Sequence, residues 1–285
     1  MIVYLNGAYV PKSKAAISPD DRGFLFADGV YEVFAAYEGR LFRTADHLTR
    51  LERSLKALRI EFGDVAVVEE IAQTLLERND LCGTNAKVYL QITRGAAPRN
   101  HAFPGADTSP TIYACASTFA RPVEKRRVGV SATFVPDNRW ARCDIKTVAL
   151  LPNAIAAQTA EERDAEEAIF VRDGALTEGS HTNVCAAVDG TMVTAPLSNY
   201  ILPGITRAVI MELCADFAIP VREFPVLFEE VPKLDELFLV GTTAEVMPII
   251  EVDGTPIGSG RPGTIAQRLG EGFDGLVAGA VEGGA

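Results

Sequence analysis

The sequence predicts an α+β protein whose strands pair largely antiparallel in a strongly bent or barrel-like sheet. Asp-Gly pairs at 173–174, 189–190 and 253–254 follow β-rich runs, and such pairs are typical of tight hairpin turns. Because hairpins join antiparallel neighbours, they disfavour a Rossmann arrangement, whose sheet is mostly parallel. Helical patterns at 153–163 and 205–217 lie between the β-rich runs, so both kinds of element are expected.

The N-terminal region predicts two hairpins followed by two amphipathic helices. An Asn-Gly turn joins Met1–Leu5 to Ala8–Val10, and a glycine joins 30–36 to 41–42. Apolar residues then recur at helical spacing, with Thr44 as the expected N-cap of the first helix; they are Leu48, Leu51, Leu55 and Leu58, then Val68, Ile71 and Leu75.

A Gly/Pro-rich loop at 95–105 separates two further β-rich runs, 87–93 and 111–116. Loops of this composition are exposed and often carry functional residues. The loop is therefore a candidate for function, and its alternative is an ordinary solvated turn.

A polar, proline-containing stretch, Ala120–Arg127 (A-R-P-V-E-K-R-R), predicts an interdomain linker. It would separate a small N-terminal domain, residues 1–119, from a larger C-terminal domain, residues 128–285. The strands of the larger domain are expected at 128–135, 168–172, 183–188, 192–194, 237–240 and 249–252. The Gly/Ala-rich tail Leu276–Ala285 is expected to be frayed.

Composition favours small molecules, or further copies of the chain, as partners. The hydrophobic fraction of 48% supplies a real core, and a net charge of -11 repels nucleic acid and anionic lipid. No apolar run is long enough to span a membrane and no signal peptide begins the sequence, so a cytoplasmic location is expected. The five cysteines form no C-x-x-C pair and predict buried free thiols, and the three histidines lack metal-site spacing, so no metal is expected.

Lys146 is the candidate nucleophile. It lies in D-I-K-T-V-A-L at 144–150, an apolar setting. Burial disfavours the ammonium form, so a desolvated lysine more readily becomes the neutral amine that a Schiff base requires. The alternative is a lysine that extends from a strand edge to solvent.

Three other segments could bind a ligand. Glu178 lies in T-E-G-S at 177–180, beside small polar residues; Ile205 and Thr206 begin a helix, where free backbone N–H groups favour an anion. Gly241-Thr242-Thr243 adds two hydroxyls after a strand. Each segment alone is equally consistent with an ordinary turn, helix start or loop.

Together, these segments resemble class IV aminotransferases, which are pyridoxal 5'-phosphate (PLP) enzymes of fold type IV. The resemblance includes D-I-K at 144–146, T-E-G-S at 177–180, N-V at 183–184, L-P-G-I-T-R at 202–207 and G-T-T-A-E-V-M-P at 241–248. The N-terminal half resembles the D-amino acid aminotransferase branch through D-R-G-F-L-F-A-D-G-V-Y-E at 21–32, H-L-T-R-L at 47–51 and T-R-G-A-A-P-R-N-H at 93–101. The resemblance extends over residues 1 to about 255 and implies a small α/β domain followed by a larger domain with a barrel-like mixed sheet.

The resemblance also implies the cofactor-binding residues. Lys146 would form the Schiff base and move the substrate proton, and Glu178 would pair with the ring nitrogen, which keeps the ring an electron sink. Arg139 would lie near the phenolic oxygen and Leu202 beside the ring. The phosphate would be held by Arg50, Ile205, Thr206, Thr242 and Thr243.

Substrate binding is implied for Tyr31, Arg99 and His101, which would hold the α-carboxylate. The family's loop reaches the active site of the neighbouring subunit, which implies a homodimer with shared sites. His181 and Thr182, also expected at the substrate, replace serines of this branch. Gly241 replaces another serine, and Pro203 precedes the glycine of the phosphate helix.

The implied reaction is D-amino acid:2-oxo acid transamination with ping-pong kinetics, for example D-alanine with 2-oxoglutarate giving pyruvate and D-glutamate. Three alternatives share the cofactor: a branched-chain L-amino acid aminotransferase, an (R)-amine transaminase and an aminodeoxychorismate lyase. A different class, a PLP-carrying or anion-binding protein without turnover, would require Lys146 to be structural.

Overall fold

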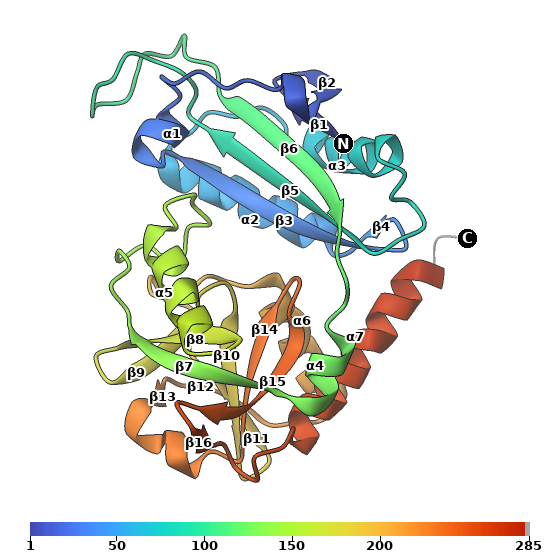
Figure 1. Cartoon of the computed structure of the whole chain (residues 1–285), viewed down its shortest axis with the longest axis vertical. Coiled ribbons are helices and arrows are strands. Elements are labelled where there is room, and N and C mark those ends of the chain that lie inside the picture. The colour runs from blue at the N-terminus through green and yellow to red at the C-terminus, as the bar shows by residue number, and fades with distance from the viewer. Residues whose placement is uncertain (283–285) are drawn as a thin grey trace. The chain divides into compact units, whose positions relative to one another are not determined.

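The computed structural model describes residues 1–282, which form two compact units (Figure 1). Unit 1 contains Met1–Ala120 and Ile145–Leu150, and unit 2 contains Arg121–Asp144 and Leu151–Glu282. The expected linker is partly helical: helix α4, Val123–Val128, falls within unit 2. Four of its six residues are charged, and the exposed Glu124 and Arg127 pair one turn apart. Residues 145–150, which carry Lys146, belong to unit 1 although the sequence suggested the larger domain.

Unit 1 is built on a six-stranded antiparallel sheet in the order β2-β1-β6-β5-β3-β4. Its strands are β1 Ile2–Leu5, β2 Ala8–Pro11, β3 Gly29–Tyr37, β4 Arg40–Leu41, β5 Ala86–Thr93 and β6 Thr111–Thr118. Helices α2, Thr44–Leu58, and α3, Val67–Arg78, pack on one face of the sheet (Figure 1). Their leucines and Ile71 fill a core with the inward residues of β3, β5 and β6. Both predicted hairpins and both predicted helices are present.

Two short elements complete unit 1, a 3-10 turn at Lys12–Lys14 and helix α1 at Arg22–Phe26. Asp21 caps α1, with its side chain accepting a hydrogen bond from the Gly23 amide at 2.8 Å. The prediction of Thr44 as an N-cap is wrong by one residue. Arg43 holds that position at φ 55° without a side-chain hydrogen bond, so backbone conformation alone begins α2.

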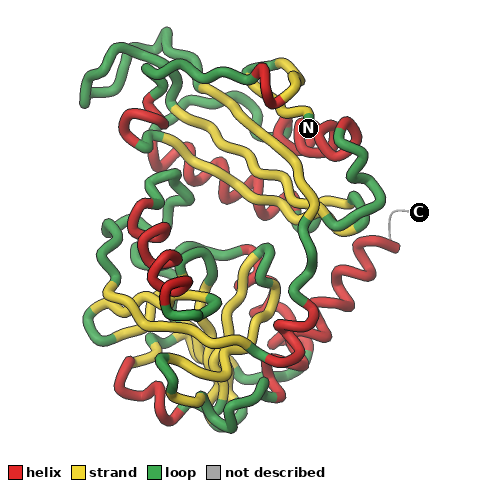
Figure 2. Tube along the Cα trace, viewed as in Figure 1, coloured by secondary structure: helices red, strands yellow, loops and turns green. Residues whose placement is uncertain are grey.

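Unit 2 contains a ten-stranded mixed sheet that closes on itself. Six strands form the ring: β7 Val130–Pro136, β8 Glu167–Arg172, β9 Ala175–Gly179, β10 Asn183–Val188, β14 Glu236–Gly241 and β15 Glu245–Val252. The ring closes because β9 pairs with β8 and also with β10, through Glu178 and Asn183. Two of its pairings, β15 with β7 and β7 with β8, are parallel. The predicted barrel-like mixed sheet is thereby confirmed, and Figure 2 shows the curvature of these strands in yellow.

The Asp-Gly turns behave as their chemistry predicts. Asp173, Asp189 and Asp253 have φ near 50°, and each following glycine has φ above 70°. Positive φ at both central residues is the signature of the hairpin turn that follows the right-handed twist of its strands. The smaller strands of unit 2 are β11 Thr191–Thr194, β12 Val221–Glu223, β13 Val226–Leu227 and β16 Thr255–Pro256.

Helices α5 Leu151–Glu162, α6 Ile205–Asp216 and α7 Thr264–Glu282, with the 3-10 segment Phe228–Lys233, complete unit 2. Helix α7 packs against α6 and β15. The expectation of a frayed tail is wrong for residues 276–282, which continue α7 because Phe273 and Val277 are buried. Residues 283–285 of that expected tail lie outside the described residues. Within residues 1–282, no helix combines the length and apolar character that crossing a bilayer requires.

Candidate active site

Lys146 and Tyr31 lie together in unit 1. The Lys146 amine is 4.3 Å from the centroid of the Tyr31 ring, and the Tyr31 amide donates to the Lys146 carbonyl at 3.0 Å. The Lys146 amide is held by the Ser54 hydroxyl of α2 at 3.3 Å. Because residues 145–150 run beside the start of β3, a lysine more than a hundred positions along the chain reaches this strand.

Arg50 is buried beside this group, in an ion pair with Glu32. Its Nε and Nη2 atoms donate to the two carboxylate oxygens of Glu32 at 2.8 Å each, and His47 Nδ1 lies 2.8 Å from the same carboxylate. The two contacts lower the pKa of Glu32 far below its ordinary value although complete burial opposes ionisation. Arg50, predicted to bind phosphate, is therefore held in a fixed orientation by the Glu32 carboxylate.

Arg99 and His101 form a second group in unit 1, against Phe26 of α1. The Arg99 guanidinium carbon lies 5.2 Å and the His101 ring 5.5 Å from the centre of the Phe26 ring. Both side chains are exposed. The structure thus brings both side chains to one aromatic ring, and their binding of the α-carboxylate stays a prediction.

Arg22 holds the backbone of the same loop. It is buried, and its Nη1 atom donates to the carbonyls of Asn100 at 2.6 Å and Ala102 at 3.3 Å. Asp28 in turn accepts from Arg22 Nε at 2.8 Å. The exposed Arg99 and His101 are thus anchored through a buried ion pair beneath them.

The buried Glu178 carboxylate of unit 2 is held by Leu202, Asn183 and Arg139. One oxygen accepts from the Leu202 amide at 2.8 Å and from Asn183 Nδ2 at 3.2 Å, and the other contacts the Arg139 guanidinium. Burial raises the pKa of Glu178 to about 7, although Arg139 and the Leu202 amide favour its charged form. A carboxyl group with this pKa can exchange or share a proton near neutral pH.

Arg139 is itself anchored by Asp137. Its Nε and Nη2 atoms each donate to Asp137 at 2.9 Å. Arg139 is also in direct contact with Glu178. The resemblance assigned these residues to the phenolic oxygen and to the nitrogen of the same ring.

The beginning of helix α6 provides an anion-binding geometry. Gly204 is its N-cap and contributes no side-chain acceptor to the amides of Ile205 and Thr206, and both of these residues are buried. A Cβ atom at Gly204 would lie 2.0 Å from Asn183 Oδ1, so only glycine fits. Thr242 and Thr243 form the half-buried turn between β14 and β15.

His181 and Thr182 form the turn between β9 and β10, and Glu167 organises it. The buried Glu167 carboxylate accepts from the Ser180 amide at 3.0 Å and the Thr182 hydroxyl at 3.0 Å, and it lies 3.0 Å from His181 Nδ1. Thr182 is buried against the barrel whereas the His181 side chain is 60% exposed. Of His181 and Thr182, both predicted near the substrate, only His181 presents its side chain to solvent.

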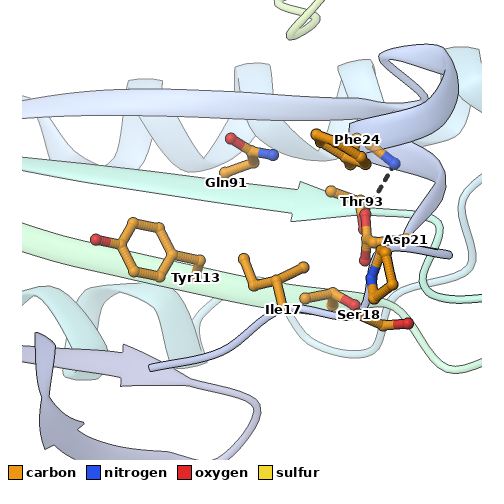
Figure 3. Close-up of a pocket in the computed structure, with 10 residues that line it drawn as sticks. Ile17, Ser18, Asp21, Phe24, Gln91, Thr93 and Tyr113 are labelled. Carbon is orange, nitrogen blue, oxygen red and sulfur yellow. Dashed lines mark hydrogen bonds between the residues drawn. The ribbon is translucent and has the colours of Figure 1, made fainter. Parts of the chain in front are cut away.

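A separate cavity of about 430 Å³ lies in unit 1 over strands β5 and β6 (Figure 3). Ile17, Phe24, Gln91 and Tyr113 line it, with Asp21 at one end. None of the site residues predicted from the sequence lines this cavity. Across the described part of the chain, no group of three or more His, Cys, Asp or Glu side chains could hold a metal ion. Three of the five free cysteines are buried, but Cys82 is exposed and Cys115 is half-buried, so the expectation of a buried thiol is wrong for these two.

Sequence reasoning missed the supporting residues Glu32, Glu167 and Asn183. Each is a buried polar residue within or beside an otherwise apolar strand. A polar residue within an apolar strand could have been noticed in the sequence, because a buried polar group needs a hydrogen-bond partner.

Known proteins match this chain along nearly its whole length. A family model for amino-transferase class IV matches residues 29–252. The D-alanine aminotransferase of Staphylococcus haemolyticus is 40% identical over 273 residues, covering 95% of this chain and 96% of that protein. The D-alanine aminotransferase of Bacillus licheniformis is 38% identical over 271 residues, covering 94% of each.

Solved structures of known proteins are similar to this chain in fold. The branched-chain amino acid aminotransferase of Escherichia coli has a TM-score of 0.88 at 26% identity, covering 97% of this chain and 94% of that chain. The branched-chain aminotransferase of Thermoproteus uzoniensis, solved with norvaline, has a TM-score of 0.85 at 28% identity, covering 99% and 96%. The family match, the sequence relatives and the shared fold together show that the chain belongs to the class IV aminotransferases, the PLP-dependent transaminases of fold type IV.

Proposed function

We propose that this transaminase acts on D-amino acids, moving the amino group of D-alanine to 2-oxoglutarate in a ping-pong reaction. The observation that carries the proposal is the 40% identity to a D-alanine aminotransferase over 95% of the chain. The positions of Arg99 and His101, both beside Phe26, support it, because two side chains with N–H donors on an anchored loop suit a carboxylate.

The residues present fit PLP. The α6 N-terminus, with a glycine N-cap, suits a phosphate dianion, and Thr206, Thr242 and Thr243 add hydroxyls. Buried Glu178, with a raised pKa, suits a protonated pyridine nitrogen, since a nearby cation would stabilise its carboxylate. We assign Arg50 and the Ile205 and Thr206 amides to the phosphate, Arg139 to the vicinity of the phenolic oxygen, and Leu202 to a position beside the ring.

Lys146 is the proposed covalent holder of the cofactor. Only a primary amine can form the required carbon–nitrogen bond, and the amine of Lys146 lies 4.3 Å from the Tyr31 ring, another residue of the proposed site. Once released, the same amine would take the proton from the substrate α-carbon and return it to the cofactor. Bound PLP supplies the electron sink for that step.

Tyr31, Arg99 and His101 are the proposed carboxylate-binding residues, and His181 with Thr182 the proposed boundary for the substrate side chain. We further propose a homodimer in which Arg99 and His101 act in the partner's site, consistent with their exposure. The absence of disulfides among the five cysteines fits the proposed cytoplasmic location.

The second candidate is a branched-chain L-amino acid aminotransferase, favoured by the fold similarity to two such enzymes. Adding D-alanine or L-leucine to the PLP-loaded protein separates the two. The proposed enzyme converts its cofactor to pyridoxamine phosphate with D-alanine, changes its visible spectrum and releases pyruvate. A faster conversion with L-leucine would establish the second candidate, and no conversion with any amino acid or (R)-amine would indicate a protein without turnover.

A further inference from the structure

Glu245 lies directly beside the proposed phosphate turn. It is the first residue of β15, follows the turn formed by Thr242, Thr243 and Ala244, and pairs with Gly241 across it. Its side chain is fully buried, and its backbone has φ 56°, in the left-handed region. A left-handed φ is uncommon for a non-glycine residue, and Glu245 adopts it at full burial.

Two arginines from the start of unit 2 hold the Glu245 carboxylate. Arg121 donates to Oε1 at 2.6 Å and to Oε2 at 2.9 Å, and Arg126 Nη1 donates to Oε2. Their side chains are 20% and 10% exposed. An ion pair so well shielded from water, with one acceptor serving two guanidinium groups, has one geometry rather than many.

The arginines are fixed in turn by helix α7. Arg126 donates to Asp274 at 2.9 and 3.1 Å and to the Gly270 carbonyl at 3.0 Å, and Arg121 also contacts Asp274. Among the described residues, the buried Arg126 Nε has no hydrogen-bond partner. The Arg126 guanidinium therefore hydrogen-bonds Glu245 and helix α7, while its remaining donor, Nε, has no partner among the described residues.

Stability alone does not account for this arrangement. A buried ion network is often no more stabilising than well-packed apolar residues, and its better-attested role is to select one conformation. Here the selected conformation is that of the residue that ends the Thr242–Ala244 turn. We propose that Glu245, clamped by Arg121 and Arg126, is a positioning residue that sets this turn to receive the cofactor phosphate.

The inference rests on the proposed phosphate role of Thr242 and Thr243. It predicts that loosening Glu245 weakens the contribution of the phosphate group and leaves other cofactor contacts in place. The decisive comparison uses PLP and pyridoxal, which differ only in the phosphate, bound to the cofactor-free protein and followed by visible absorbance.

Glu245→Gln should weaken PLP binding by roughly tenfold, the scale of coupling between neighbouring groups, and change pyridoxal binding far less. Glu251→Gln, on the same strand but away from the turn, is the matched control and should leave the PLP-to-pyridoxal ratio unchanged. Arg126→Lys keeps the positive charge but loses the several N–H donors of the guanidinium. It should shift the PLP-to-pyridoxal ratio in the same direction as Glu245→Gln. It serves as the test if Glu245→Gln does not fold.

An equal loss of PLP and pyridoxal affinity in these variants would overturn the inference, since it would reflect general loosening of the barrel. An unchanged ratio would overturn it as well. If the wild-type protein binds PLP no better than pyridoxal, the proposed phosphate site itself is wrong. If the wild type prefers PLP and the variants keep the same PLP-to-pyridoxal ratio, only the proposed role of Glu245 is wrong.

Discussion

The Lys146 amine and the Tyr31 ring are 4.3 Å apart, and the backbones of the same two residues are joined by a 3.0 Å hydrogen bond. This double contact places the amine beside β3, and the family motif at 144–146 is the reason Lys146 is proposed to carry the cofactor. Borohydride reduction of the resting PLP-loaded protein should fix the cofactor on the peptide containing Lys146. Lys146→Ala should abolish that label, and Lys233→Ala should keep it. A label on Lys87 or Lys233 in the wild type would contradict the assignment.

Glu178→Gln should retain PLP, because the phosphate ligands are unchanged, but slow the half-reaction with D-alanine by about 10²-fold. The physical reason is the loss of a carboxylate that stabilises a protonated ring nitrogen, which weakens the electron sink in the transition state. Stopped-flow absorbance measures this rate directly. A wild-type rate in Glu178→Gln would remove Glu178 from the proposed role.

The raised pKa of Glu178, about 7, also predicts a pH dependence for the cofactor-free protein. The unfolded chain loses this proton near pH 4.5, whereas the folded chain keeps it to about pH 7. The associated stability is therefore present below pH 4.5 and is lost as pH rises through 7. Urea unfolding at several pH values should show a steeper decline from pH 5 to 7.5 in the wild type than in Glu178→Gln; parallel curves would argue against the raised pKa.

Arg99→Ala should lower kcat/KM for D-alanine by roughly 30-fold to several thousand-fold, since losing one partner of a desolvated charge pair costs about 2 to 5 kcal/mol. A simple (R)-amine, which has no carboxylate, should lose far less. Arg261→Ala, an exposed arginine in unit 2, is the control and should leave both values unchanged. Equal losses on both substrates would show that Arg99 does not bind the carboxylate.

Asp28→Asn should lower the free energy of unfolding by about 3 kcal/mol at pH 7, because it leaves the buried cations Arg22 and Arg94 without their shared carboxylate. These arginines lower the pKa of Asp28, although burial opposes them. The contribution is thus present above the unfolded pKa of 3.8 and disappears as pH falls through the folded value. Glu166→Gln, which removes an exposed partner of Lys125, should have little effect. Equal effects of the two substitutions would exclude a special role for burial at Asp28.

The hairpins and the main helices could be predicted from the sequence, because the signals that specify them are local. An Asp-Gly pair favours its turn through the φ values of two adjacent residues, as Asp173 and Gly174 show. The same holds for the amphipathic spacing of α2 and for the family motif around Lys146. A polar stretch is a weaker signal, which is why the expected linker proved partly helical.

Tertiary structure decided the partners of the charged residues and the closure of the barrel. Arg50 pairs with Glu32, Arg139 with Glu178 and Arg121 with Glu245. The partners are 18, 39 and 124 residues apart in the sequence. No local pattern encodes such a choice, because each pair forms only after folding has excluded water from both groups and made an unpaired charge costly. The closing contact between Glu178 and Asn183 likewise depends on the curvature that the whole ring of strands accumulates, which no single strand specifies.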